Sequence, residues 1–106
     1  MVTEITPSEL HARRAAGNGP VVVDVREKWE LDVASIPDVL NIPMNDIPAR
    51  IGELDSGQEV VVMCRSGGRS MQVANFLARN GFKSVANLTG GILAWSRDVD
   101  PSVSAY

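Results

Sequence analysis

The 106-residue sequence contains one cysteine and one histidine. A single cysteine cannot form a disulfide within its own chain, and one cysteine with one histidine is too small a ligand set for a zinc site without many carboxylates. The sequence therefore predicts neither a bound metal nor a structural disulfide. If the cysteine has a special role, it is as a free thiol.

Positive charge and long apolar runs are also scarce. Lys and Arg number 10 against 13 Asp and Glu, which gives a net charge of −3 and argues against nucleic acid or anionic membrane as a partner. No segment approaches the roughly 18 apolar residues of a membrane-spanning helix, and the first residues lack the pattern of a signal peptide. We expect a soluble cytoplasmic protein whose apolar residues fit one core, and hence a monomer.

Strand and helix patterns alternate along the chain. Strands are predicted over residues 21–25, 39–42, 59–63 and 84–87, and the β-branched runs in the first and third of these are typical of strands buried on both faces. Helices are predicted over residues 7–16, 27–34, 45–54 and 71–80, and in a last segment through residues 91–95. This order indicates an α/β fold with a mainly parallel sheet and helices on both faces. We expect one domain over residues 1–97 and a polar tail over residues 98–106, extended over the surface or partly disordered.

The cysteine lies in the segment Cys64-Arg-Ser-Gly-Gly-Arg-Ser70, directly after a predicted buried strand and before a predicted helix. Such a loop directs backbone N–H groups into one concavity, where the helix dipole also favours negative charge. Gly67 and Gly68 let the backbone fold closely around the sulfur, and Arg65 and Arg69 favour both a thiolate and an anionic ligand. The pattern predicts an anion-binding loop with a nucleophile at its centre.

Each of these residues also has a simpler interpretation. Cys64 is a small apolar residue that cores often bury, and the glycines suit an ordinary strand-to-helix turn. The hydroxyls of Ser66 and Ser70 are candidate donors to the sulfur or to an oxyanion, but serine near a helix start is often only a cap.

The charged residues near this loop leave alternatives open. Arg69 falls in the first turn of a helix, where a cation opposes the helix dipole unless a bound anion or a nearby carboxylate compensates. For Arg65 and Arg69 the alternatives are a solvated surface charge or an ion pair with Asp24 or Glu27. Asp24 itself is predicted to be structural, buried by pairing with a backbone N–H group or an arginine.

Residues outside the Cys64 loop are assigned to the pocket, the surface or the core from their position in the predicted strands and helices. The segment from Asp24 to Glu27, which includes Arg26, ends a strand at the same sheet edge as the Cys64 loop and is expected to share its pocket. His11 is predicted to lie on the surface. Trp29 and Trp95 are predicted to be core anchors, with a position at the mouth of the pocket as the alternative for Trp29.

Five ordered motifs make the chain resemble the rhodanese family of sulfurtransferases, and specifically its single-domain bacterial members. The motifs are Ile5-Thr-Pro7 with Glu9-Leu10, Val23-Asp-Val-Arg-Glu27, Asn41-Ile-Pro43, the loop Cys64–Ser70, and Leu88-Thr-Gly-Gly-Ile92 with Ala94-Trp95. The resemblance implies a parallel five-stranded sheet and a Cys64 that takes sulfane sulfur, as a persulfide, from thiosulfate or a persulfide donor. The acceptor would be cyanide or a thiol, including a protein thiol, and no cofactor is implied.

The resemblance also implies roles for individual residues. The N–H groups of Arg65, Ser66, Gly67, Gly68, Arg69 and Ser70 would hold the outer sulfur of the persulfide. Arg65 and Arg69 would orient an anionic donor. Apart from the resemblance, Asp24 and Arg26 are predicted to support the site from outside the loop. One departure concerns residues 34–39, Ala-Ser-Ile-Pro-Asp-Val, where the family usually has Gly-His-Ile-Pro-Gly-Ala.

Two other functions are weighed against sulfur transfer. Cysteine-dependent phosphatases and arsenate reductases place five residues between cysteine and arginine, whereas four separate Cys64 from Arg69, giving a loop better sized for one sulfur atom than for an oxyanion. A non-catalytic rhodanese-like binding module is the third hypothesis. Such a module would be expected to lose the thiol or the loop charge, and this sequence keeps both.

Overall fold

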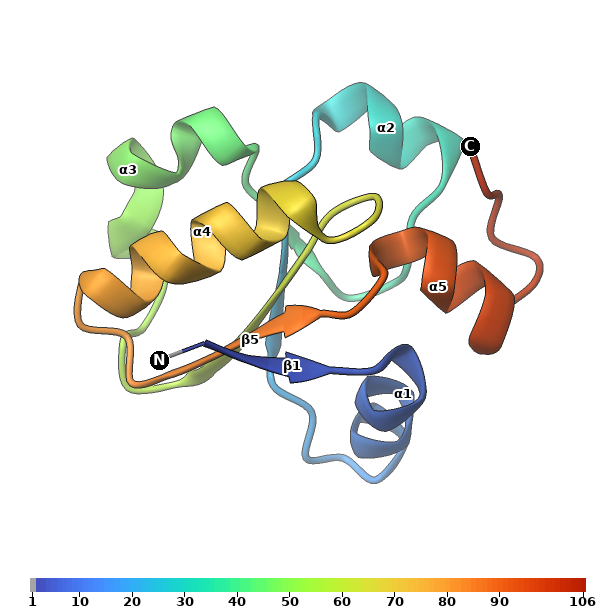
Figure 1. Cartoon of the computed structure of the whole chain (residues 1–106), viewed down its shortest axis with the longest axis horizontal. Helices are drawn as coiled ribbons and strands as arrows, with labels where there is room; N and C mark the ends of the chain where they lie inside the picture. Colours follow the sequence, from blue (N-terminus) through green and yellow to red (C-terminus); the bar gives the residue numbers. More distant parts are fainter. Residues whose placement is uncertain (1) are drawn as a thin grey trace.

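A parallel sheet runs through the middle of the computed structural model, which describes residues 2–106 (Figure 1). Its strands are β1 (Val2–Ile5), β2 (Val21–Asp24), β3 (Leu40–Asn41), β4 (Glu59–Met63) and β5 (Ser84–Leu88). The helices are α1 (Pro7–Ala15), α2 (Lys28–Val33), α3 (Ile47–Arg50), α4 (Gly68–Arg79) and α5 (Gly91–Asp98), with 3₁₀ turns η1 (Met44–Asp46) and η2 (Ile51–Glu53). The five strands lie in the order β1-β5-β4-β2-β3, and every pair is parallel. The predicted fold class is confirmed.

Helices cover both faces of the sheet and enclose an apolar cluster on each side (Figure 1). The cluster beneath α3 and α4 includes Val23, Ile47, Val60, Val62, Val73, Leu77 and Val85. The cluster beneath α1 and α5 includes Leu10, Val22, Val61, Met63, Ile92 and Trp95. Successive residues of β2 and β4 therefore serve opposite cores, which explains why these strands are apolar at almost every position. No helix within residues 2–106 has the length and apolar character needed to cross a membrane.

The strand β1 was not among the strands predicted from the residue pattern. It is an edge strand that pairs only with β5, and its central residues, Thr3 and Glu4, are exposed. A four-residue strand with a polar centre carries neither an apolar run nor a clear alternation. Only the resemblance to a five-stranded family implied it.

The first helix begins as the sequence predicts. The Thr6 hydroxyl accepts from the Glu9 backbone N–H at 3.1 Å, and the Glu9 carboxylate accepts from the Thr6 N–H at 2.9 Å. The predicted helix over residues 45–54, in contrast, is broken into η1, α3 and η2. Its apolar face is still used, because Ile47 is buried and Ile51 and Leu54 pack against the same cluster.

The prediction that Trp29 anchors the core is wrong. Trp29 is 62% exposed, whereas the neighbouring Glu30 on α2 is 3% exposed. The helix therefore turns a carboxylate inward, and the ion pair that this carboxylate forms, described below, is the physical reason. Trp95 is buried as predicted, and the exposed ring of His11 contacts it edge-on at 6.0 Å between ring centroids.

The segment that departs from the family pattern is held by two arginines. The Arg14 guanidinium donates to the carbonyl oxygen of Pro37 at 2.5 Å, and Arg26 donates to that of Ala34 at 2.9 Å. Of the retained Ile-Pro pair, Ile36 is buried in the core, whereas Pro37 is exposed. Asp38 has a φ of +60°, a left-handed conformation in which the family's usual glycine is free of strain.

The C-terminal residues pack back onto the domain. Val103 and Tyr106 contact the cluster beneath α5, and the Ser96 hydroxyl donates to the Val103 carbonyl oxygen at 2.5 Å. This packing brings Tyr106 to the Cys64 loop.

The start of α5 lies directly against the end of β4. The N–H of Ile92 donates to the carbonyl oxygen of Cys64 at 3.0 Å, and that of Leu93 donates to the carbonyl oxygen of Arg65 at 3.2 Å. Gly91 permits this approach: its φ is +59°, and a Cβ there would lie 2.5 Å from the Cys64 carbonyl oxygen and overlap that of Arg65.

Replacing Gly91 by alanine should therefore be strongly destabilising. We expect Gly91→Ala to lower the free energy of unfolding by about 3 kcal/mol, because the methyl group meets backbone atoms and the positive φ is strained. Chemical denaturation measures this, with Gly52→Ala as the matched control, since a Cβ at Gly52 meets nothing within 4 Å. Equal stability of the two variants would contradict the proposed packing.

Candidate active site

Cys64 is the first residue after β4, and its side chain is almost completely buried at 1% exposure. The loop reaches α4 through Gly67, which precedes the helix with a φ of +114°. That positive φ is the reason a glycine is needed here. The predicted placement, a cysteine between a buried strand and a helix start, is confirmed.

Backbone N–H groups and a hydroxyl of the loop surround the sulfur. The backbone N–H groups of Gly67 and Ser70 donate to Cys64 Sγ at 3.1 and 3.4 Å, and Ser70 Oγ lies 3.2 Å from it. Burial raises the pKa of Cys64. The Ser70 hydroxyl and the N–H groups of Ser70, Gly67 and Ser66 lower it, and the balance leaves the pKa below its ordinary value of 9.0. The simpler interpretation is thus half right, because Cys64 is buried in the apolar cluster beneath α3 and α4 but its sulfur also accepts hydrogen bonds from the loop.

The two serines of the loop differ. The Ser70 side chain is fully buried against the sulfur, whereas Ser66 is exposed, and within residues 2–106 its hydroxyl forms no hydrogen bond with Cys64. Ser66 contributes only its backbone N–H. Of the two predicted hydroxyl donors, the structure brings one to the thiol.

Asn87 extends this arrangement and was not recognised in the sequence. The Ser70 hydroxyl donates to Asn87 Oδ1 at 2.5 Å, and Asn87 Nδ2 donates to the carbonyl oxygen of Gly67 at 3.3 Å. The available signal was an asparagine between apolar residues of β5, and in the structure it is 4% exposed. A hydroxyl has one proton, so Ser70 donates to Asn87 while Cys64 is a thiol and turns that proton to the sulfur when Cys64 ionises.

The carboxylate that compensates Arg69 is Glu30. Arg69 Nη1 and Nη2 donate to the two oxygens of Glu30 at 2.7 and 2.9 Å. The ion pair with Asp24 or Glu27, which the sequence suggested, is therefore wrong for Arg69. The hydrogen bonds from Arg69, opposed by burial, lower the pKa of Glu30 to about 2. The sequence signal that could have identified this partner is a glutamate in the first turn of the helix that follows β2.

Asp24 is structural, as predicted. Its carboxylate accepts from the Arg26 backbone N–H at 3.0 Å and from Arg26 Nη2 at 2.7 Å, and both side chains are fully buried. Arg26 also donates to the Tyr106 hydroxyl at 2.9 Å. Because both side chains are fully buried, the pair holds the end of β2 and the Tyr106 side chain in place and does not itself face solvent.

Arg65 is exposed and contacts Tyr106, a residue that the sequence analysis left in the tail. Arg65 Nε donates to the backbone oxygen of Tyr106 at 2.6 Å, Nη2 donates to the same oxygen, and the guanidinium lies 5.2 Å from the centre of the Tyr106 ring. The Tyr106 hydroxyl donates to Glu30 Oε1 at 2.7 Å. Trp29 contacts the same ring edge-on, with centroids 6.5 Å apart. Nothing in the sequence pattern pointed to Tyr106.

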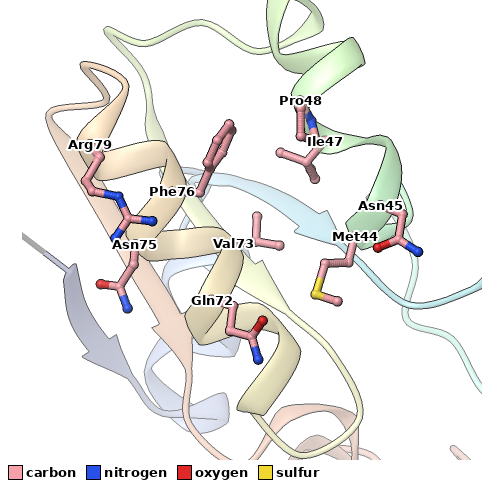
Figure 2. A pocket seen from close by; sticks show the side chains of 9 residues that line it. All are labelled: Met44, Asn45, Ile47, Pro48, Gln72, Val73, Asn75, Phe76 and Arg79. Atoms are coloured by element: carbon pink, nitrogen blue, oxygen red, sulfur yellow. The ribbon is translucent and has the colours of Figure 1, made fainter.

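A surface groove of about 460 Å³ lies between α4 and the η1–α3 segment (Figure 2). Figure 2 shows Phe76 and Val73 of α4 facing Ile47 and Pro48, with Arg79 at one end. The residues lining the groove do not include the Cys64 loop, so the groove and the thiol are separate features.

Comparisons with known proteins agree with this geometry. A family model described as "Rhodanese-like domain" matches residues 6–98. A protein of *Allochromatium vinosum* named "Sulfurtransferase" is 41% identical over 104 residues, which cover 98% of this chain and 97% of that protein. A chloroplastic protein of *Arabidopsis thaliana*, "Rhodanese-like/PpiC domain-containing protein 12", is also 41% identical, but this chain spans only 38% of it.

A solved structure shows the same fold. The crystal structure of a rhodanese-like domain protein from *Staphylococcus aureus* superposes with a TM-score of 0.85 at 29% identity and covers 98% of both chains. The matched range of the family model begins at the cap of α1, ends with α5 and contains the whole Cys64 loop. The chain therefore belongs to the rhodanese-like domain family.

Proposed function

We propose that this domain is a sulfurtransferase that carries sulfane sulfur as a persulfide on Cys64. The observation that carries the proposal is the buried thiol of Cys64 with the N–H groups of Gly67 and Ser70 directed at its sulfur. These donors stabilise negative charge on sulfur, both in the thiolate and in the persulfide that replaces it. Family membership and a relative of the same length named sulfurtransferase support the same assignment.

The reaction proceeds in two exchanges. The Cys64 thiolate attacks the outer sulfur of a donor, a new sulfur–sulfur bond forms as the donor's bond breaks, and the leaving group departs with the bonding electron pair. With thiosulfate the leaving group is sulfite, and with a persulfide it is a thiol. A thiol or cyanide then attacks the outer sulfur and returns Cys64 as the thiolate. Atoms and electrons balance without a further cofactor.

The loop determines where the transferred sulfur lies in this proposal. The N–H groups of residues 65–70 hold the outer sulfur, a role supported by the N–H groups of Gly67 and Ser70 at Cys64 Sγ. The carbonyl oxygens of Cys64 and Arg65 accept from α5 instead. A reactive thiol must stay reduced between turnovers, which favours the cytoplasm as its compartment. The acceptor is a small thiol, cyanide or an exposed thiol of a protein, and the domain acts as a monomer.

The loop geometry favours sulfur transfer over phosphatase or arsenate reductase chemistry. Those reactions need an arginine free to wrap a tetrahedral oxyanion, but Arg69 donates both terminal nitrogens to Glu30. A non-catalytic binding module would gain nothing from a thiol whose pKa is lowered.

Intact-mass measurement tests the proposal. After incubation with thiosulfate or an organic persulfide and removal of the donor, the protein should gain the mass of one sulfur atom, and cyanide should reverse the gain. Cys64→Ser should show no gain. An unchanged mass of the wild-type protein with every donor, or an equal gain in Cys64→Ser, would refute the persulfide.

Ser70→Ala should make the thiol less acidic, because one donor that lowers the pKa of Cys64 is lost. We expect the midpoint of the pH profile for alkylation by iodoacetamide to rise by about one pH unit. Ser66→Ala is the matched control, since that exposed serine contributes only its backbone N–H, which alanine retains. An equal rise in both variants would rule out a specific role for the Ser70 hydroxyl.

A further inference from the structure

Both arginines of the Cys64 loop are engaged by other parts of this chain. Arg69 directs its two terminal nitrogens at Glu30, at 2.7 and 2.9 Å. Arg65 directs Nε and Nη2 at the backbone oxygen of Tyr106 and places its guanidinium over the Tyr106 ring. The donor pairs best suited to hold an oxyanion are therefore already in use.

Glu30 is held firmly in this position. Its side chain is 5% exposed and accepts from four groups: Nη1 and Nη2 of Arg69, the Tyr106 hydroxyl at 2.7 Å and the Glu27 backbone N–H at 2.8 Å. These donors keep the carboxylate ionised at neutral pH, with a pKa of about 2. Moving it aside would break several charge-assisted hydrogen bonds, so an incoming anion meets a fixed negative charge beside the loop.

We propose that Glu30 is a specificity-determining residue that neutralises Arg69 and so disfavours doubly charged sulfur donors relative to donors of lower charge. This inference rests on the proposed sulfur transfer. It names the class of donor: an organic persulfide or another donor with at most one negative charge, in preference to the thiosulfate dianion. Tyr106 acts as a positioning residue, because its hydroxyl holds Glu30 and its backbone oxygen holds Arg65.

Two donors that differ in charge but undergo the same bond exchange isolate this effect. In each, the Cys64 thiolate attacks the outer sulfur, the Cys64 sulfur–sulfur bond forms, and the bond to the oxidised sulfur breaks. Thiosulfate, with two negative charges, releases sulfite. Methanethiosulfonate, with one, releases methanesulfinate. The leaving group takes the electron pair in both cases, so no other reactant is needed.

The experiment compares kcat/KM for loading of Cys64 from these two donors. In Glu30→Gln, the ratio of thiosulfate to methanethiosulfonate should rise roughly tenfold, which corresponds to about 1.4 kcal/mol. Glu59→Gln is the matched control, because Glu59 accepts from both terminal nitrogens of Arg13 at the opposite end of β4. Its ratio should stay near that of the wild-type protein.

The wild-type protein supplies a second measurement that needs no variant. Its preference for methanethiosulfonate over thiosulfate should exceed that of a small free thiol in solution. An unchanged ratio in folded Glu30→Gln, or a wild-type preference for thiosulfate beyond that of the free thiol, would overturn the role of Glu30 and leave the persulfide intact. If neither of these donors nor an organic persulfide loads Cys64, the proposed function is refuted instead.

Discussion

The contact between the first turn of α5 and the end of β4 is the constraint on which the site depends. The N–H groups of Ile92 and Leu93 bind the carbonyl oxygens of Cys64 and Arg65, and only glycine at position 91 allows the two backbones to come this close. With those carbonyls directed away, the N–H groups that follow turn toward the sulfur. The paired glycines after β5 therefore belong to the thiol site, although they lie far from it in the sequence.

The positive charge of Arg69 in the loop is balanced by a carboxylate of this chain. Arg69 stands where a helix dipole disfavours a cation, and Glu30 compensates for it. The same carboxylate accepts from Tyr106, which in turn accepts from Arg26 of the buried pair with Asp24. A continuous network thus links the strand end of β2, the helix α2, the loop and the last residue described. The backbone N–H groups at the sulfur therefore supply the positive partial charge that stabilises a thiolate.

The sequence was sufficient for the features that local patterns encode. The β-branched runs of β2 and β4 predicted buried parallel strands, the Thr6 cap predicted α1, and the position of Cys64 between a strand and glycines predicted its loop. Features that depend on contacts between residues far apart in the sequence could not be predicted from local patterns. The inward turn of Glu30, which leaves Trp29 exposed, depends on Arg69 almost forty positions away. The position of Tyr106 at the loop depends on the packing of the C-terminal residues against the domain. The formation of strand β1 depends on its pairing with β5.

The central claim is that backbone N–H groups of the loop hold negative charge on the Cys64 sulfur. A pH titration followed by the amide proton shifts of Gly67 and Ser70 tests it most directly, with the exposed Gly52 as internal reference. Both loop amides should move downfield together as the thiol ionises, with one midpoint below the ordinary cysteine value of 9.0, while Gly52 stays still. Amides that do not respond, or a midpoint at or above that value, would contradict the account.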